Sequence, residues 1–484
     1  MGEVRGDRGS GSGQGGGGRI TQLVKAAADD LARVRDDLTA LEGTRARKPV
    51  RAARHLGRSA GRVTSRLARL WRDPEPAPVK QSKPVPTELV RFLRECGTAL
   101  CLAGETTDRV QQAVDELGER YGLSPVQALV LPTGVFVRVG DGADAVVDFA
   151  PVEGRPLGLD QIGELYHFLH ELSEHPVTPE AGTKRLREIE ALPPRYPVEL
   201  RVLGYATLTL GLGLLTYPNP WALLGYAVLG TAVGALRELV AGPLKLLAQA
   251  LPVVAALLVT VLAYRYAGPL LGEDPAKMLV PPLLAFLPGA ALTMGMMELS
   301  AGSWVSGSSR LVYGLSVLLL LVFGITVGAE LMHPHPVEHD HARSFGEWAP
   351  WAGVVLLGLG HTLNSSAPWR SLPWLLLVLF AVEGVQTLGQ AVSDALMGAF
   401  LGGVSLPLIA RLVENRRGAP PAQVTFLPAF WLLVPGATSL SAVGELVTGD
   451  RAHGVLTTVS ALLTVVAVAL GVMVGASTLR RRAD

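Results

Sequence analysis

Residues 288–307 read PGAALTMGMMELSAGSWVSG, and residues 435–454 read PGATSLSAVGELVTGDRAHG. A shift of 147 positions pairs identical residues of the two stretches, namely Pro288 with Pro435, Gly289 with Gly436, and Glu298 with Glu445. The same shift pairs GITVGA at 324–329 with GVMVGA at 471–476, near the ends of the two halves. A match that keeps one register over this length indicates an internal repeat. Each copy places a helix-breaking Pro-Gly pair and a glutamate in an apolar segment.

Hydrophobic residues are unevenly distributed along the chain. The 484 residues are 49% hydrophobic, with a mean hydropathy of +0.34. The first 195 residues are rich in charge, whereas residues 196–478 hold long apolar runs such as VVAALLVTVLA and VLLLLVFGITVGA. Apolar helices of about 20 residues cross about 30 Å of hydrocarbon. The distribution therefore predicts an integral membrane protein with a polar N-terminal extension.

The apolar region divides into ten segments of suitable length, 199–217, 221–240, 246–269, 279–299, 310–331, 349–364, 372–391, 393–412, 425–446 and 455–478. The shift of 147 maps the first five segments onto the second five. Because five is an odd number, the second copy must start on the opposite side of the bilayer from the first. We therefore expect an all-α polytopic protein with ten transmembrane helices, arranged as two inverted five-helix repeats. The repeats are residues 196–334 and 349–478, joined by an external His-rich linker at 335–348.

Positive charges predict the orientation. With the N-terminus inside, twelve Lys and Arg residues lie on the inner side: Arg195, Arg201, Arg237, Lys245, Arg310, Arg370, Arg411, Arg416, Arg417, Arg480, Arg481 and Arg482. Four lie outside: Arg265, Lys277, Arg343 and Arg451. Cytoplasmic loops carry the excess of positive charge in membrane proteins. We expect a multi-pass protein of the cell membrane with both termini in the cytoplasm.

Residues 86–195 are predicted to form a small cytosolic α/β domain. Segments 86–104, 105–122, 159–173 and 178–191 have helical apolar spacing, and segments 126–132, 134–139 and 145–150 alternate as strands do. We find no Gly-rich phosphate loop, metal cluster or catalytic trio here, so a regulatory or gating role is the expectation, not an enzyme. Cys96 and Cys101 are expected to be reduced, partly buried thiols, because their spacing fits no common metal or redox motif.

Residues 1–85 form an extension that has a Gly- and Ser-rich start, an Arg-rich middle and a Pro-rich linker. Two interpretations stay open for its basic stretch: a solvated tail, or a segment that touches anionic lipids of the inner leaflet. The net charge of +1 argues against a nucleic-acid partner. No cofactor is implied, and a second copy of the chain in a homo-oligomer stays open as a partner.

The repeated motif predicts a substrate site. A break inside a membrane helix is tolerated where protein or a water-filled cavity surrounds the freed backbone groups. The helix N-terminus after Pro288-Gly289 or Pro435-Gly436 can hold a carboxylate. Glu298 or Glu445 can then hold an ammonium group or carry a coupling proton. Four hydroxyl residues complete the candidate binding set: Thr293, Ser300, Thr438 and Ser439. The alternative is that both glutamates face interfacial water and that Pro-Gly only eases helix packing.

Three other polar features stand out in the apolar region. Glu383 interrupts LLLVLFAVEGVQTLGQ and is a candidate proton-coupling residue, although its repeat mate is Leu236. His361 and Asn364 lie near a span end, and we expect them at the interface. The external loop HPHPVEHDH offers His333, His335, His339 and His341. We expect it to be a solvated linker, with a weak metal site as the alternative.

Two stretches resemble a known family. FLPGAALTMGMMELSAGSWVSGSSRLVYG with its echo in the ninth segment, and LCLAGETTDRVQQAVDELGERYGL followed by LPTGVFV, are similar to the threonine/serine exporter family. The likeness covers roughly residues 88–478. It implies ten spans, a cytosolic N-terminal domain, and export of threonine and serine driven by the proton-motive force. Residues 1–80 lie outside the likeness, and the second copy departs from the first at Asp450 and Arg451.

The sequence therefore predicts a secondary transporter that exports small hydroxylated amino acids against proton entry. Two alternatives stay open. One is a carrier of another small solute, such as a metal ion or an organic acid. The other is a membrane scaffold that transports nothing and recruits partners through its cytosolic domain.

Overall fold

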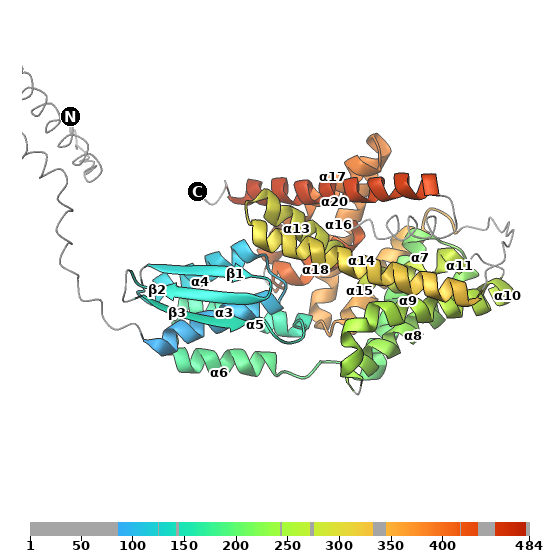
Figure 1. Ribbon diagram of the computed structural model, residues 1–484. Helices are drawn as coiled ribbons and strands as arrows, with labels where there is room; N and C mark the ends of the chain where they lie inside the picture. Colours follow the sequence, from blue (N-terminus) through green and yellow to red (C-terminus); the bar gives the residue numbers. More distant parts are fainter. Residues whose placement is uncertain are drawn as a thin grey trace, which may run out of the picture. The chain divides into compact units, whose positions relative to one another are not determined.

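The computed structural model describes residues 86–123, 125–141, 145–242, 244–271, 275–332, 345–416, 418–433 and 451–480 (Figure 1). The chain divides into two units, Met1–Lys83 and Pro84–Asp484. The basic extension, the His-rich loop at 333–341 and the second Pro-Gly motif all lie outside the described residues. All of the described residues therefore belong to the second unit.

The first elements of this unit form an α/β part. Helices α3 (Thr87–Leu102) and α4 (Thr107–Arg120) precede strands β1 (Val126–Leu131), β2 (Gly134–Val139) and β3 (Val146–Pro151), and helices α5 (Leu159–Glu174) and α6 (Pro179–Glu190) follow. The strands form an antiparallel sheet in the order β1-β2-β3, with Val126 opposite Val139 and Val139 opposite Val146. All three predicted strands are confirmed, and the alternation of side chains explains why they form.

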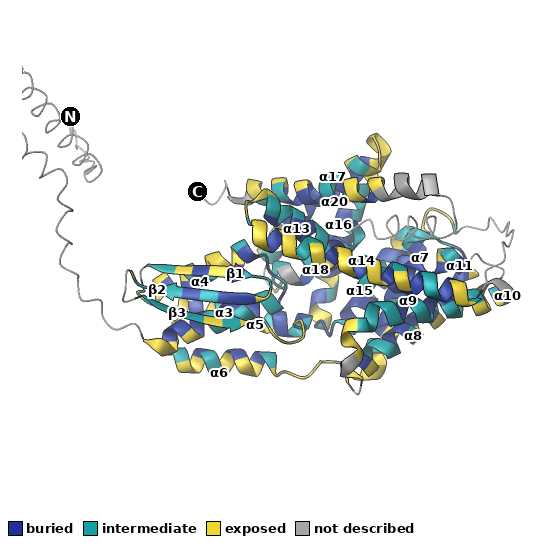
Figure 2. Cartoon of the chain, viewed as in Figure 1, coloured by how far each residue is buried: buried dark blue, intermediate teal, exposed yellow. Residues whose placement is uncertain are grey.

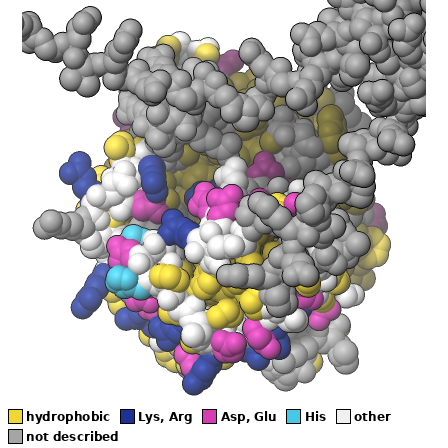
Figure 3. Space-filling view, turned by 90° about the vertical axis from the view of Figure 1, so that its left-hand side faces the viewer, with side chains coloured by type: hydrophobic (Ala, Val, Ile, Leu, Met, Phe, Trp, Pro, Cys, Tyr) yellow, Lys and Arg dark blue, Asp and Glu magenta, His cyan; other side chains and the backbone are white. Residues whose placement is uncertain are grey.

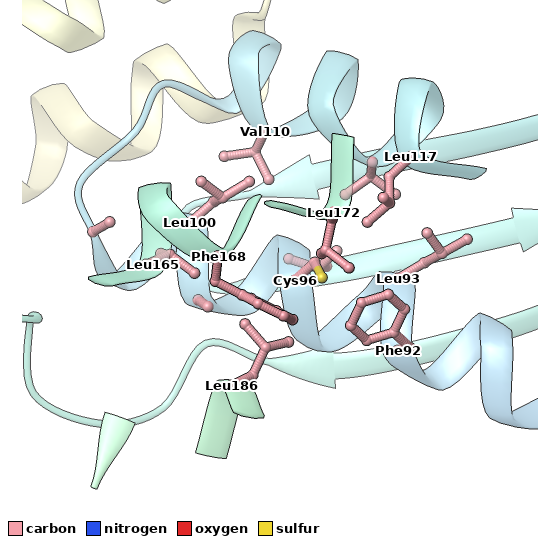
Figure 4. Packing of buried hydrophobic residues seen from close by; sticks show 14 of the residues in the cluster. Phe92, Leu93, Cys96, Leu100, Val110, Leu117, Leu165, Phe168, Leu172 and Leu186 are labelled. Atoms are coloured by element: carbon pink, nitrogen blue, oxygen red, sulfur yellow. The ribbon is translucent and has the colours of Figure 1, made fainter. Parts of the chain in front are cut away.

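One face of the sheet carries the core of the α/β part. Ala128, Val130, Val135 and Val137 point to the covered face, while Leu129 between them is exposed. Helices α3 and α4 pack on the sheet. Figure 4 shows Phe92, Cys96, Phe168 and Leu172 meeting in this core, which α5 and α6 complete. Gly182 of α6 lies so close to the Phe92 ring that any side chain there would overlap it.

The remaining helices form an apolar helical part. Seven are long and apolar enough to cross a membrane: α7 (Val198–Thr216), α8 (Ala222–Ala241), a segment around α9 (Leu251–Leu262), α14 (Trp304–Met332), α16 (Leu372–Val392), α17 (Ala395–Glu414) and α20 (Arg451–Arg480). They coincide with seven of the ten expected spans. An eighth expected span is a bent pair of helices, Pro275–Phe286 and Gly289–Ser300. The sixth and ninth are represented in the described residues by shorter helices, α15 (Ala349–Asn364) and α18 (Ala422–Leu433).

Large apolar side chains cover the outside of these helices. On α14 alone, Trp304, Val312, Leu319 and Phe323 are each at least 60% exposed (Figure 2). Exposed apolar surface of this extent is unfavourable in water and is typical of a surface that faces lipid. The α/β part differs in its surface. Figure 3 shows acidic and basic side chains mixed over the face of the molecule in that view, and exposed ion pairs such as Lys184 with Glu188 lie on α6. The chain is therefore a membrane protein with several apolar spans.

Helices α7 and α15 pack directly on each other through glycines. A Cβ atom at Gly211 would lie 2.5 Å from the backbone nitrogen of Leu357, and one at Gly204 would lie 2.6 Å from that of Asn364. Only glycine allows so close an approach, which is a common means of association between membrane helices. Gly204 faces Gly360 while Gly211 faces Gly353. As one residue number rises the other falls, so the two helices are antiparallel.

A second pair of contacts repeats at the shift of 147 positions. Gly324 of α14 lies against the carbonyl of Val253 in α9, and Gly471 of α20 lies against the carbonyl of Phe400 in α17. One turn on, Gly328 meets the Leu257 carbonyl and Gly475 meets that of Val404. In both pairs the two residue numbers rise together, so α9 is parallel to α14 and α17 is parallel to α20. The repeated sequence therefore makes repeated contacts.

Candidate functional site

The bend in the fourth expected span lies at the first Pro-Gly pair. Helix α12 (Val280–Leu283) continues into a single 3-10 turn, η4 (Leu284–Phe286), and helix α13 (Gly289–Ser300) starts afresh at 54° to it. Leu287 between them is extended, with ψ of 128°, and no side chain caps the start of α13. Proline lacks an amide donor and clashes with the preceding turn, which explains the break. The predicted kink is confirmed for the first copy.

Glu298 lies near the other end of α13 and is only 2% exposed. Its Oε1 accepts hydrogen bonds from the backbone nitrogen and the hydroxyl of Thr107, both at 3.1 Å. Its Oε2 accepts one from Arg310 Nε, also at 3.1 Å. We call Thr107, Glu298 and Arg310 the docking cluster. The alternative in which Glu298 faces interfacial water is wrong, because protein donors surround this carboxylate.

The docking cluster joins the two parts of the molecule. Thr107 is the first residue of α4, where backbone N–H groups have no acceptor within the helix, so a carboxylate is stabilised there. Arg310, on α14, also donates to the backbone oxygen of Glu105 at 3.3 Å. Close by, the Ser303 hydroxyl donates to Asp108 at 2.8 Å. The two family-like stretches, GETTDRV and MELSAGSWVSGSSR, therefore lie against each other.

An open cavity of about 640 Å³ lies beside the docking cluster. Residues of α4, α5, the end of α17 and the segment before α18 line it, among them Glu105, Arg109, Tyr166, Arg411 and Glu414. The Tyr166 hydroxyl donates to Glu105. Burial, and then the neighbouring Glu105 carboxylate, raise the pKa of Tyr166 well above its usual value, so this hydroxyl stays protonated. The cavity walls carry both signs of charge.

The other predicted site residues of the first copy are spread along α13. Thr293 is fully buried, and its hydroxyl has no hydrogen-bond partner among the described residues. Ser300 is exposed and donates to the Met296 carbonyl of its own helix at 2.8 Å. Gly289 is buried at the bend. Pro288 directly precedes α13, Gly289 and Thr293 lie in its first half, and Glu298 belongs to the docking cluster instead.

The second copy cannot be placed. Pro435, Gly436, Thr438, Ser439 and Glu445 lie outside the described residues. Their assignment to a substrate site stays a prediction. Glu383, on α16, is partly buried, and no ion pair or hydrogen bond of its side chain occurs among the described residues. Its proposed proton-coupling role also stays a prediction.

His361 is buried in protein, so the expectation that it is exposed at the interface is wrong. The side chain is 5% exposed, and its ring lies edge-on to Trp431 of α18 with centroids 5.3 Å apart. The reason is that α18 packs against this end of α15, a contact that the apolar pattern of α15 alone does not predict. Asn364 accepts a hydrogen bond at 3.3 Å from Arg237, a residue that sequence reasoning used only to predict orientation.

Sequence reasoning also missed Thr107 and Arg310. Both lie within the stretches that resemble the exporter family, which was the available signal. Thr107 and Glu298 are 191 residues apart, and no periodicity in the sequence links positions so distant.

Comparisons with known proteins agree with the resemblance. Residues 91–332 match one family model for a threonine/serine exporter, and residues 352–478 match a second. Curated relatives include the pheromone-regulated membrane protein 10 of Candida albicans, 25% identical over 75% of this chain and 34% of the relative. The protein of the same name from Kluyveromyces lactis is 24% identical over 72% of this chain and 37% of the relative. That from Eremothecium gossypii is 23% identical over 90% of this chain and 60% of the relative.

The chain spans only about a third of the length of the Candida relative. No solved structure matches the chain. The two family models together cover both halves of the apolar region and most of the α/β part. The chain belongs to the threonine/serine exporter family.

Proposed function

We propose that this protein exports threonine and serine from the cytoplasm across the cell membrane, driven by the proton-motive force. The observation that carries the proposal is the broken span at Pro288, inside a chain that matches exporter models in both halves. A break in a membrane helix frees backbone donors and acceptors at membrane depth, which is how many secondary transporters build a substrate site. The buried Thr293 hydroxyl, without a partner among the described residues, lies one turn into the helix after the break.

Ten spans in two inverted halves fit the observed contacts. Because α9 is parallel to α14, the chain must cross back between them, and the bent pair is the segment that does so. Because α17 is parallel to α20, a second return is needed between them, in the segment that contains α18. The first helices of the two halves, α7 and α15, are antiparallel, as inversion requires.

Contacts of the α/β part support a common cytoplasmic side. Besides the docking cluster, Leu159 donates to the Ser365 carbonyl at 3.1 Å, and the hydroxyl of Tyr196, just before α7, donates to that of Ala367 at 2.9 Å. Residues of α5 and of the loop after α17 line the same cavity. The segments it touches are those that a ten-span path places on one side. They also carry Arg310, Arg370 and Arg411, in agreement with the positive-inside rule.

Glu383 is the proton-coupling residue that we favour among the described acids. Glu298 already has three hydrogen-bond donors from protein groups. Glu383 has no charged partner in the described part of the chain. One turn away, the buried Gln386 side-chain oxygen also lacks a donor there. A carboxyl group in a membrane span without a fixed partner is the kind of group that proton-coupled carriers use. Glu445 remains a candidate from the second copy.

A counterflow experiment tests the function. Proteoliposomes preloaded with unlabelled threonine are placed in labelled threonine, and accumulation of label is followed with and without an imposed pH gradient. We expect labelled threonine to accumulate inside the vesicles and added serine to reduce this accumulation. An imposed pH gradient of either sign should change the amount of label that accumulates. Absence of threonine flux together with accumulation of a labelled divalent cation or organic acid would favour another carrier. Absence of any flux would favour a scaffold.

A further inference from the structure

Arg237 on α8 is a cation in a membrane span with an incomplete set of partners. Its guanidinium carbon lies 4.9 Å from the centroid of the Tyr205 ring on α7. Its Nη1 donates to the Asn364 side-chain oxygen at 3.3 Å. Among the described residues it forms no ion pair, and the adjacent carboxylate, Glu238, is bound to Arg201 instead at 2.5 Å. An arginine has five N–H donors, so most of those on Arg237 have no acceptor among the described residues.

His361 completes the cluster. It lies three residues before Asn364 on α15, so the two share a face of that helix. Asn364 is the residue that the Arg237 guanidinium contacts. His361 is 5% exposed, and neither of its ring nitrogens has a hydrogen-bond partner in the described part of the chain. A buried imidazole with two unmet nitrogens is costly, and each such group in a native structure calls for a missing partner. We call Arg237, His361 and Asn364 the Arg237 cluster.

The chemistry of the cluster selects an anion of a particular shape. A guanidinium fork matches the two oxygens of a carboxylate. The Arg237 guanidinium carbon lies over the Tyr205 ring, and its N–H groups have one acceptor among the described residues, Asn364. An N–H of His361 can donate to the same group, and Asn364 holds the arginine in place. Ionisable residues within membrane spans are rare, and they often mark substrate or ion pathways.

The position of the cluster fits the start of an export path. Asn364 ends α15, and the next residue, Ser365, accepts a hydrogen bond from Leu159 of the α/β part. The cluster therefore lies near the side that we assign to the cytoplasm. The Tyr205 hydroxyl donates to the Pro282 carbonyl at 2.8 Å, which ties the cluster to the broken span.

We propose that the Arg237 cluster binds the α-carboxylate of the amino-acid substrate at the cytoplasmic end of its path. The inference rests on the proposed function. Arg237 supplies the paired N–H groups, His361 a further donor, and Asn364 positions the guanidinium. A substrate that lacks the carboxylate, such as threoninol or threonine amide, is therefore not bound there.

The test compares wild type with Arg237→Gln and Arg237→Lys in the counterflow assay. The matched control is Arg265→Gln, because Arg265 also lies over a tyrosine ring, at 5.4 Å from Tyr266, but near the expected outer end of its span. We expect Arg237→Gln to raise the half-saturating threonine concentration by roughly 30-fold or more, because the bound carboxylate loses its charged partner. The half-saturating concentration of Arg237→Lys should lie between those of wild type and Arg237→Gln, and that of Arg265→Gln should equal the wild-type value. Threoninol should not compete in wild type.

Two outcomes separate this inference from the proposed function. If wild type transports threonine and Arg237→Gln keeps the same half-saturating concentration, the cluster is not the carboxylate site although the exporter function stands. If wild type transports no threonine, thermal stabilisation of the purified proteins by acetate, with acetamide as control, decides the matter. Stabilisation of wild type but not of Arg237→Gln supports a carboxylate site. Equal stabilisation of both, or of neither, overturns it. Size-exclusion profiles of all variants exclude misfolding, and His361→Gln provides a second variant.

Discussion

Glu298 illustrates what one residue in a sequence can and cannot tell. Its recurrence at Glu445 made it a candidate site residue, with exposure to interfacial water as the alternative. Its partners could not be predicted, because Thr107 comes from α4 and Arg310 from α14, beyond the reach of helical spacing. The prediction that it receives a substrate ammonium stays untested. Its three donors indicate a second role, which is to hold the α/β part on the helices.

Cys101 is a native reporter of that contact. Burial raises the pKa of its thiol to about 11, with the Glu298 and Glu105 carboxylates adding to the rise and Arg310 opposing it. A pKa about two units above the reference value of 9.0 lowers the reactive thiolate about a hundredfold at neutral pH. We expect slow alkylation of Cys101 in wild type and at least a tenfold faster reaction in Glu298→Ala, because release of the α/β part exposes the thiol.

Mass spectrometry after timed alkylation at constant pH measures this rate. Ser300→Ala is the control, since Ser300 lies on the same helix and bonds only to its own backbone. Cys96 is deep in the core of the α/β part, and burial raises the pKa of its thiol strongly, so it should stay unreactive unless the domain unfolds. Equal Cys101 rates in wild type and Glu298→Ala would show that the cluster does not hold the two parts together.

Glu383 allows a test of proton coupling at one side chain. Glutamine keeps the shape of glutamate but cannot release a proton. We expect Glu383→Gln to retain threonine exchange in counterflow and to lose the response to an imposed pH gradient. Glu330→Gln, an exposed position near the end of α14, is the control. A mutant that still accumulates threonine against a gradient when pH is the driving force would exclude Glu383 as the coupling site.

At the scale of elements, the sequence predicted more of the structure than it did for the partners of single residues. The Pro-Gly pair predicted the break before α13, and the alternation of side chains predicted all three strands. The expected segment 349–364 has the same bounds as α15, whereas the residues that follow α18 lie outside the described part of the chain. The burial of His361 was missed because it depends on the packing of α18 against α15, which the apolar pattern of α15 alone does not predict.

The glycine contact between α7 and α15 gives a stability test. A methyl group at Gly211 would press on the backbone of Leu357, whereas one at Gly384 on α16 would meet nothing within 4 Å. We expect Gly211→Ala to destabilise the protein by about 1–3 kcal/mol, because neither backbone can yield. Gly384→Ala should be neutral or slightly stabilising, since alanine favours the helix. Thermal unfolding of the detergent-solubilised variants, followed by size-exclusion fluorescence, compares them. Similar melting temperatures for both would show that these helices separate at little cost.

At the scale of the whole molecule, the repeat was the most accessible feature. Matching residues of the two copies are separated by a constant number of positions, and the contacts of Gly324 and Gly471 are separated by the same number. The docking of the α/β part on the ends of several helices was not accessible. It depends on isolated polar contacts such as Ser303 with Asp108, which leave no pattern in a single sequence.

The inverted arrangement makes a prediction about sidedness. If α7 starts in the cytoplasm, the antiparallel α15 must start outside, and the segment at 335–345 that precedes it must be external. The parallel pairs then return the C-terminal end of α20 to the cytoplasm. We expect a cysteine introduced as Glu338→Cys to react with a membrane-impermeant maleimide in intact cells. Ala483→Cys should react only after permeabilisation, and wild type measures the background of Cys96 and Cys101. Labelling of both positions from the same side of the membrane would contradict the inverted arrangement of the two halves. The parity argument, and with it a substrate path between two inverted halves, would then fail even though the glycine contacts remained.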